Sequence, residues 1–174
     1  MISEFFFQIA ELKKLQRSGW KIKVGLENSE SVAEHSYMMS VMSMVLSDMI
    51  SLDSEKVLKM TILHDWAESK IGDFMPEQIG YDKKSELENY AMSEILESLP
   101  QKIQDDYQNI WDEFLSRETP ESKLVYELDK LEMALQAKIY EKDVDPEKIK
   151  PFIISAVEQI IDPQVKRILV DILK

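Results

Sequence analysis

Apolar residues recur at three- and four-residue steps through almost the whole chain, and this helical period constrains the fold more than any other feature. The first repeat, near the N-terminus, consists of Phe5, Ile9, Leu12 and Leu15. Only 4 Gly and 6 Pro occur among 174 residues, which leaves little material for hairpin turns. No segment has the pattern of a convincing strand, repeat or linker, and the length suits one domain. We therefore predict an all-α fold with a single domain over residues 1–174.

Capping signals place the helices within this pattern. Ser31-Val-Ala-Glu34 has the form of a capping box. Later in the chain, three pairs combine an N-cap residue with a proline at the first helical position. The expected helices are one from about 5 to 17, one from 31 to 50, one opened by Asp53 or Ser54, two over about 85–98 and 101–116, and three opened by Thr119-Pro120, Asp145-Pro146 and Asp162-Pro163. Loops are expected over about 19–28 and 72–80.

The charge balance excludes several classes of partner. The chain has 33 acidic and 21 basic residues, a formal charge of −12, and such a surface repels nucleic-acid backbones. A small phosphate ester stays compatible if a metal ion reverses the local field. The absence of Cys excludes disulfides and thiolate chemistry. The first residues lack the form of a secretory signal, and the most apolar segment, 38–50, is too short to span a bilayer. We expect a cytoplasmic protein with no membrane partner.

The two histidines are the first candidates for chemistry. His35 and His64 each lie in an expected helix among apolar neighbours. On the third helix, Glu68 shares the apolar face of His64, and Asp65 flanks it. Unpaired charge is costly to bury, and a divalent metal would neutralise it. The alternative for each histidine is a hydrogen-bonded core residue, because a two-residue His-Asp motif also arises by chance. The pair alone leaves both interpretations open.

Four short segments taken together are far more specific than the His-Asp pair. In chain order they are Ser31-Val-Ala-Glu-His35-Ser, Leu63-His64-Asp65-Trp-Ala-Glu68, Ile71-Gly72-Asp73 and Glu127-Leu-Asp129-Lys-Leu-Glu-Met-Ala-Leu-Gln-Ala137, with Lys13-Lys-Leu-Gln-Arg17-Ser-Gly-Trp20 upstream. This pattern resembles the HD-domain family of metal-dependent phosphohydrolases, and within that family the branch of small 5′-deoxynucleotidases. The resemblance covers about residues 5–142, and the helices of 146–174 are expected to pack on that part.

The resemblance implies a metal site. The residues that match the family's ligands are His35, His64, Asp65 and Asp129. Periodicity alone would make Asp129 a solvated acid beside a stripe of leucines. The family implies Mn²⁺, Co²⁺ or Mg²⁺, and ligand chemistry does not exclude Fe²⁺, Zn²⁺ or Ni²⁺.

Four further residues match functional positions of the family. Glu68 matches the acid that works with the metal-bound water, and Arg17 matches an arginine that contacts phosphate. Asp73 matches an acid that contacts the substrate or, with Glu68, a second metal. The alternatives are a turn residue for Asp73 and a cation favoured by a helix C-terminus for Arg17. Some members place a Trp directly after the arginine, where it helps to exclude a ribose 2′-hydroxyl. Here two residues precede Trp20, so its contact with the substrate and the deoxyribose preference are open.

The implied activity is hydrolysis of a nucleoside 5′-monophosphate, 2′-deoxy by resemblance, in a homodimer. One rival is a phosphohydrolase of the same fold that acts on a cyclic nucleotide, an alarmone or a dNTP. Alarmone hydrolases of this fold typically have an adjacent Glu-Asp pair, whereas Ser69 follows Glu68 here. A rival from a different class is a non-catalytic helical interaction module that keeps the metal as a structural clip. Such a module has no use for Glu68.

Overall fold

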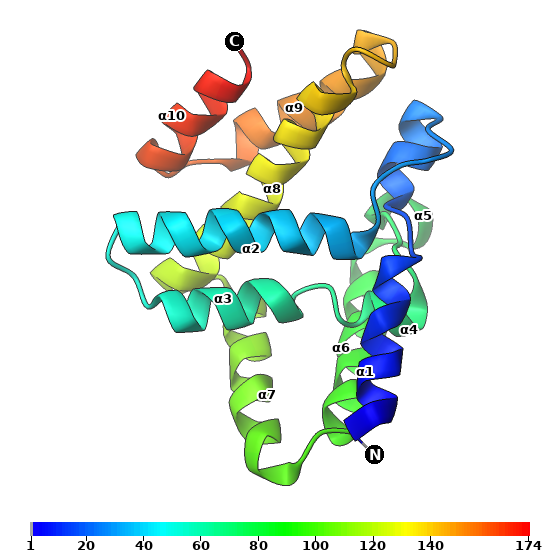
Figure 1. Cartoon of the computed structure of the whole chain (residues 1–174), viewed down its shortest axis with the longest axis vertical. Helices are drawn as coiled ribbons and strands as arrows, with labels where there is room; N and C mark the ends of the chain where they lie inside the picture. The colour runs from blue at the N-terminus through cyan, green and yellow to red at the C-terminus, as the bar shows by residue number, and fades with distance from the viewer. Residues whose placement is uncertain (1) are drawn as a thin grey trace.

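The computed structural model describes residues 2–174 as an assembly of helices (Figure 1). Over that range the only β-type pairing is an isolated bridge between Gln16 and Ser31. The elements are α1 (Ile2–Ala10), the 3₁₀ turn η1 (Glu11–Lys13), the π-helical turn η2 (Trp20–Val24), α2 (Val32–Met49), α3 (Ser54–Leu63), α4 (Glu68–Ile71), α5 (Pro76–Ile79), α6 (Tyr81–Glu97), α7 (Gln101–Ser116), α8 (Pro120–Tyr140), α9 (Pro146–Gln159) and α10 (Pro163–Ile172). The prediction of an all-α fold is confirmed.

The capping signals of the sequence are present in the structure. Ser31 Oγ accepts from the backbone N–H of Glu34, and the Glu34 carboxylate accepts from the backbone N–H of Ser31, which completes the capping box that opens α2. The last three helices begin at Pro120, Pro146 and Pro163, each after a side chain that accepts from the first turn. These starts agree with the sequence prediction.

The third predicted helix is shorter than expected, and this difference shapes the site. We expected one helix to carry both His64 and Glu68, but α3 ends at Leu63 and α4 begins at Glu68. Nδ1 of His64 lies 2.6 Å from the carbonyl oxygen of Thr61, an acceptor that a continuing helix would give to the N–H of Asp65. The chain then continues in tight turns, so His64 and Asp65 leave the helix on a bend.

Two expected loops contain short helical segments. The π-helical turn η2 occupies part of 19–28 and ends at Gly25, whose φ of 85° suits a residue without a Cβ. α5 lies within the predicted 72–80 loop, and α6 begins at Tyr81 rather than near 85. The turn-forming residues of these regions predict loops, and the sequence contains no signal for the single helical turns found within them.

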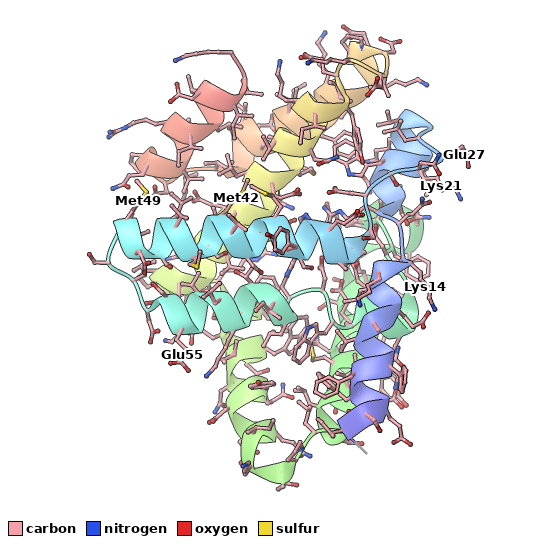
Figure 2. All side chains as sticks on the ribbon, viewed as in Figure 1. Lys14, Lys21, Glu27, Met42, Met49 and Glu55 are labelled. Carbon is pink, nitrogen blue, oxygen red and sulfur yellow. The ribbon has the colours of Figure 1, made fainter. Side chains whose placement is uncertain are left out.

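The main core lies between α2, α3 and the long α8 (Figures 1 and 2). Met39, Met60 and Leu128 are fully buried there, and Ala156 of α9 and Val165 of α10 join the same cluster. The C-terminal helices therefore pack on α8. Buried apolar side chains also gather in a second cluster between α1, α3, α6 and α7, and in a third where η2 meets α8 and α9. Within residues 2–174, no helix combines the length and apolarity needed to cross a bilayer.

Candidate metal centre

Three separate elements bring four predicted ligands together. His35 lies in the first turn of α2, His64 caps the end of α3, Asp65 follows it on the bend, and Asp129 lies in the middle of α8. These helices pack on one another through the main core, which positions the site; His35 and His64 are buried, whereas Asp65 and Asp129 are partly exposed.

The distances between their ligand atoms suit a shared cation. One ligand atom of each of His35, His64 and Asp129 lies within 4.8 Å of the others, a spacing able to hold a metal ion. His35 Nε2 lies 3.3 Å from Asp129 Oδ1 and 3.8 Å from Asp65 Oδ2. His64 Nε2 lies 3.0 Å from Asp65 Oδ2. Asp65 Oδ2 thus lies close to both imidazoles, although it is not part of that group of three.

Several polar atoms at this point have no hydrogen-bond partner. Among residues 2–174, five buried side-chain polar atoms lack one, and four of them belong to this site: His35 Nε2, His64 Nε2, Asp65 Oδ2 and Glu68 Oε2. Buried polar atoms are rarely left without partners, and exceptions need a reason. A divalent cation would satisfy imidazole and carboxylate lone pairs together, so the donor set fits a metal.

Fixed acceptors hold both imidazole rings on their other side. Nδ1 of His35 lies 2.5 Å from Oε2 of Glu132, and Nδ1 of His64 lies 2.6 Å from the Thr61 carbonyl oxygen. An acceptor at Nδ1 requires the proton on Nδ1, so in the neutral ring, the form that binds metals, the Nε2 lone pair faces the site.

Neighbouring charges shift the pKa values of Asp65, Asp129 and His35. Burial alone would raise the pKa of Asp65, but His64, His35 and Arg17 outweigh it and lower the pKa. The pKa of Asp129 is held well below its ordinary value, because Lys130, His35 and Arg17 outweigh its burial. Burial and Arg17 lower the pKa of His35, but the neighbouring carboxylates of Asp129 and Glu132 raise it to about 9. Both aspartates are thus ionised, as metal ligands must be.

Glu68 follows Asp65 by three residues and is buried, with 5% of its surface exposed. Burial, Asp65 and Asp73 raise its pKa well above the ordinary value. Its Oε1 lies 3.8 Å from Nζ of Lys84, which is 3.3 Å from Glu88. A buried carboxyl group with a raised pKa, next to residues able to bind a metal ion, is suited to proton transfer.

Arg17 reaches the cluster from the segment that follows η1. Its Nη1 lies 3.7 Å from Asp65 Oδ2, and its Nη2 lies 3.8 Å from Asp129 Oδ1. The segment is fastened to the loop after α4, because Asp73 Oδ2 accepts from the backbone N–H of Ser18 and the Ser18 hydroxyl donates to the Asp73 carbonyl, both at 2.5 Å. The structure therefore places Asp73 behind the arginine segment, with one carboxylate oxygen already engaged.

Trp20 does not reach the cluster. Its side chain is 1% exposed and stacks on Phe152 of α9 with ring centroids 4.3 Å apart. The indole N–H donates to Glu30 Oε1, and that same oxygen is 4.0 Å from Nε of Arg17. The structure thus places Trp20 in the third core cluster, with Glu30 between its indole and Arg17, and a substrate contact of Trp20 stays a prediction.

Four residues near the site were missed by sequence reasoning. They are Glu30, Lys84, Lys130 and Glu132. Lys130 holds Asp129 Oδ2 at 2.8 Å, which turns the other oxygen toward His35. Glu132 follows Asp129 by three residues, so helical spacing could have found it once Asp129 was chosen. No local pattern marks Glu30 or Lys84, because their proximity to the cluster depends on how distant segments pack.

Comparison with known proteins identifies the family. The family model described as HD domain matches residues 9–168, almost the whole chain. The chain belongs to the HD-domain family. The resemblance stated from the sequence is thereby confirmed.

Curated relatives of this HD domain include 5′-deoxynucleotidase HDDC2 of Dictyostelium discoideum, 39% identical over 147 residues, which cover 80% of this chain and 77% of the relative. The protein of the same name from Danio rerio is 34% identical over 164 residues, covering 93% and 81%. A solved structure from Pyrococcus horikoshii is 32% identical, has a TM-score of 0.78 and matches over 99% of this chain and 96% of its own.

Proposed function

We propose that this HD domain hydrolyses nucleoside 5′-monophosphates, with 2′-deoxyribose preferred, to the nucleoside and phosphate. The observation that carries the proposal is the convergence of unpartnered buried ligand atoms at one point, beside a buried acid and an arginine. The curated relatives, named 5′-deoxynucleotidases and similar over most of both chains, support the same reaction class.

His35, His64, Asp65 and Asp129 would hold one divalent ion in this proposal. A divalent ion there would polarise a phosphoryl oxygen and make water a stronger nucleophile at neutral pH. Two imidazoles and two carboxylates suit Mn²⁺ and Co²⁺, and Mg²⁺ is also implied by the family; Fe²⁺, Zn²⁺ and Ni²⁺ fit the same ligands.

Glu68 would be the general base. Its Oε2 has no partner, and a pKa raised toward the operating pH suits an acid that must both take and return a proton. The water oxygen bonds to phosphorus, the bond between phosphorus and the 5′-oxygen breaks, and that oxygen receives a proton to complete the nucleoside.

Arg17 would bind the phosphoryl oxygens, because a guanidinium fork matches them and remains charged. Asp73 would position Arg17 through Ser18, and its second carboxylate oxygen would remain available for the substrate or, with Glu68, for a second metal. The sugar and base would supply the binding energy that aligns the reacting phosphate.

A phosphate-release assay tests the proposal. Metal-stripped protein is supplied in turn with Mn²⁺, Co²⁺ and Mg²⁺, and kcat/KM is measured for dAMP, dCMP, dGMP, AMP, dATP and p-nitrophenyl phosphate. We expect the deoxynucleoside monophosphates to lead, because an extra phosphate adds charge where acids already gather and an aryl phosphate lacks the sugar and base.

The other outcomes separate the rivals. A clear advantage for dATP would move the protein to the triphosphohydrolase class, and equal rates for AMP and dAMP would remove the deoxyribose preference. Metal-loaded protein that releases phosphate from none of these compounds would contradict the proposal. His64→Ala, prepared in parallel, controls for contaminating phosphatases.

A further inference from the structure

The His35 ring contacts the Glu132 carboxylate on the side that faces away from the proposed metal site. Its Nδ1 lies 2.5 Å from Glu132 Oε2, and neither residue has more than 1% of its surface exposed. A hydrogen bond to a carboxylate in such an environment is short and strong, because solvent cannot compete for either partner. This bond also joins α2 to α8 across 97 residues of sequence.

The other ring nitrogen has no such partner. His35 Nε2 is buried without a hydrogen bond and points to Asp129 Oδ1 at 3.3 Å. Glu132 and Asp129 lie three residues apart on α8, so one helical turn supplies an acid to each side of the same imidazole. The two acids have different tasks in the neutral ring, because Glu132 accepts the Nδ1 proton while Asp129 lies on the side of the Nε2 lone pair.

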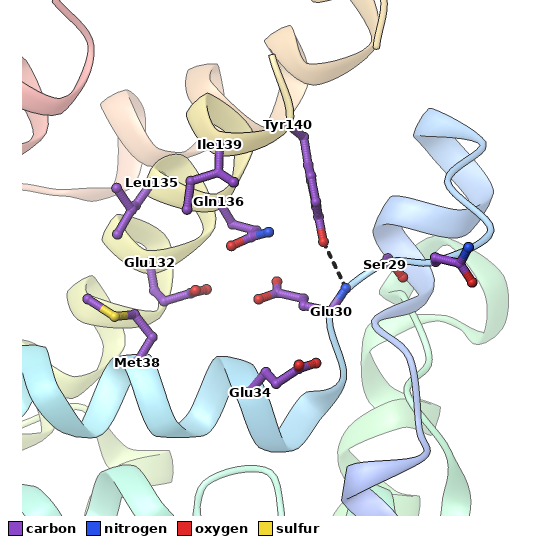
Figure 3. Close-up of a pocket in the computed structure, with 10 residues that line it drawn as sticks. Ser29, Glu30, Glu34, Met38, Glu132, Leu135, Gln136, Ile139 and Tyr140 are labelled. Atoms are coloured by element: carbon purple, nitrogen blue, oxygen red, sulfur yellow. Dashed lines mark hydrogen bonds between the residues drawn. The ribbon is translucent and has the colours of Figure 1, made fainter. Parts of the chain in front are cut away.

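A cavity of about 390 Å³ lies beyond Glu132 (Figure 3). Glu30 and Glu132 extend toward each other across it, but Glu30 is engaged elsewhere: its carboxylate accepts from Trp20, and its backbone N–H donates to the Tyr140 hydroxyl. Glu30 is therefore a partly buried acid of the same neighbourhood that is not hydrogen-bonded to His35. This difference makes it a matched comparison for Glu132.

We propose that Glu132 is a positioning residue: it holds the proton on Nδ1 of His35 and the plane of the ring, so that Nε2 is presented to the metal. The inference rests on the proposed metal site and deepens it. His64 obtains the same orientation from a backbone carbonyl, which no side-chain substitution can remove. Of the two groups that accept from the histidine Nδ1 atoms, only the Glu132 carboxylate can therefore be tested by mutation.

Histidine NMR measures the effect without substrate or metal. The chain contains only two histidines, so ¹⁵N-labelled imidazole spectra of metal-stripped protein contain one set of signals for His35 and one for His64. In the wild type we expect the single proton of the neutral His35 ring to reside on Nδ1 rather than on Nε2, because only Nδ1 faces the Glu132 carboxylate. In Glu132→Leu and Glu132→Gln this selectivity should weaken for His35 and remain unchanged for His64.

Metal affinity is the second measurement. Loss of an orienting partner of a metal-binding histidine typically costs about 10–100-fold in affinity, so calorimetric titration with Mn²⁺ should show a weakening of that size in both variants. Glu30→Gln and Glu127→Gln are the controls, because the first removes the charge of a partly buried acid near the ring and the second that of a buried acid earlier on α8. Both should bind Mn²⁺ with nearly wild-type affinity.

The results separate this inference from the proposed function. An unchanged His35 spectrum and unchanged Mn²⁺ affinity in a folded Glu132 variant would overturn the positioning role even if the enzyme is active. Equal losses in Glu132→Gln and Glu127→Gln would also overturn it, because they would indicate a general effect on α8. If the spectral and affinity changes appear but wild-type protein hydrolyses no nucleotide, the positioning role stands and the proposed substrate class fails.

Discussion

Glu68→Gln preserves the size of a buried side chain but removes its charge and its ability to take a proton. Glu68 Oε2 has no hydrogen-bond partner, and the nearest cation, Lys84, lies 3.8 Å from the other oxygen. A positioned acid–base group typically contributes 10²–10⁴-fold to the rate. We therefore expect kcat to fall by about 10²-fold or more, which corresponds to about 2.7 kcal/mol of activation free energy.

The same substitution should stabilise the metal-free protein at neutral pH. Burial and repulsion from Asp65 and Asp73 raise the pKa of Glu68 despite the opposing effect of Lys84. A pKa that is higher in the folded than in the unfolded chain means that the folded state binds the proton more tightly, so stability falls as the pH rises above about 4.5. Glutamine does not ionise and removes this loss. Each kcal/mol relieved raises Tm by roughly 2–4 °C in a chain of this size.

Two assays together check the reasoning. Turnover of dAMP is measured with metal content determined on the same sample, and Tm of metal-stripped protein is measured at pH 5 and pH 8. We expect lower kcat with metal retained, and a gain in Tm that is larger at pH 8. Glu86→Gln, an exposed acid on α6, is the control for a surface charge change. Near-normal kcat with metal bound would remove Glu68 from the mechanism, and a lower Tm at pH 8 would refute the electrostatic argument.

Three further substitutions test other parts of the molecule. His64→Ala should weaken Mn²⁺ binding by at least about tenfold in calorimetry, because a missing imidazole cannot be replaced by a neighbour; unchanged affinity would remove His64 from the ligand set. Arg17→Lys keeps the charge but loses the fork, so KM for dAMP should rise about tenfold while Mn²⁺ affinity is kept, and an unchanged KM would argue against a phosphate contact. Leu128→Ala leaves a cavity in the main core and should cost about 2–5 kcal/mol in urea unfolding; a loss below about 1 kcal/mol would mean that the core there relaxes.

The sequence predicts the helices well where local chemistry defines them. The capping box at Ser31 and the proline starts at Pro120, Pro146 and Pro163 act within one turn, so the sequence alone locates these helix starts. The end of α3 was not predictable in the same way. At the bend after Leu63, Nδ1 of His64 lies within hydrogen-bond distance of the Thr61 carbonyl oxygen, a local contact that apolar periodicity does not encode.

The candidate site shows the same division. His35, His64 and Asp65 could be proposed from residue type and apolar surroundings. Asp129 could not, because its position beside a leucine stripe is also that of a surface acid, and only the family resemblance selected it. The structure adds the physical reason: Lys130 holds one Asp129 oxygen and turns the other toward His35. Such a reason depends on three-dimensional packing of α8 against α2, which no local pattern contains.

The arrangement of Arg17 connects the acidity of the chain to its proposed substrate. The carboxylates of Asp65, Asp129 and Glu30 lie 3.7–4.0 Å from its guanidinium, farther than a hydrogen bond, so they attract the side chain without engaging its donors. Burial lowers the pKa of Arg17, but attraction to Asp129 and Asp65 outweighs it and raises the pKa, so the charge is secure. If a bound metal ion neutralises the two aspartates, we expect the hydrogen bonds between Ser18 and Asp73 to hold the Arg17 segment in position. The N–H groups of Arg17 can then donate to a phosphate. A chain with a net charge of −12 can thus bind a phosphate dianion, because the positive charge that attracts the phosphate is confined to the proposed metal site and Arg17.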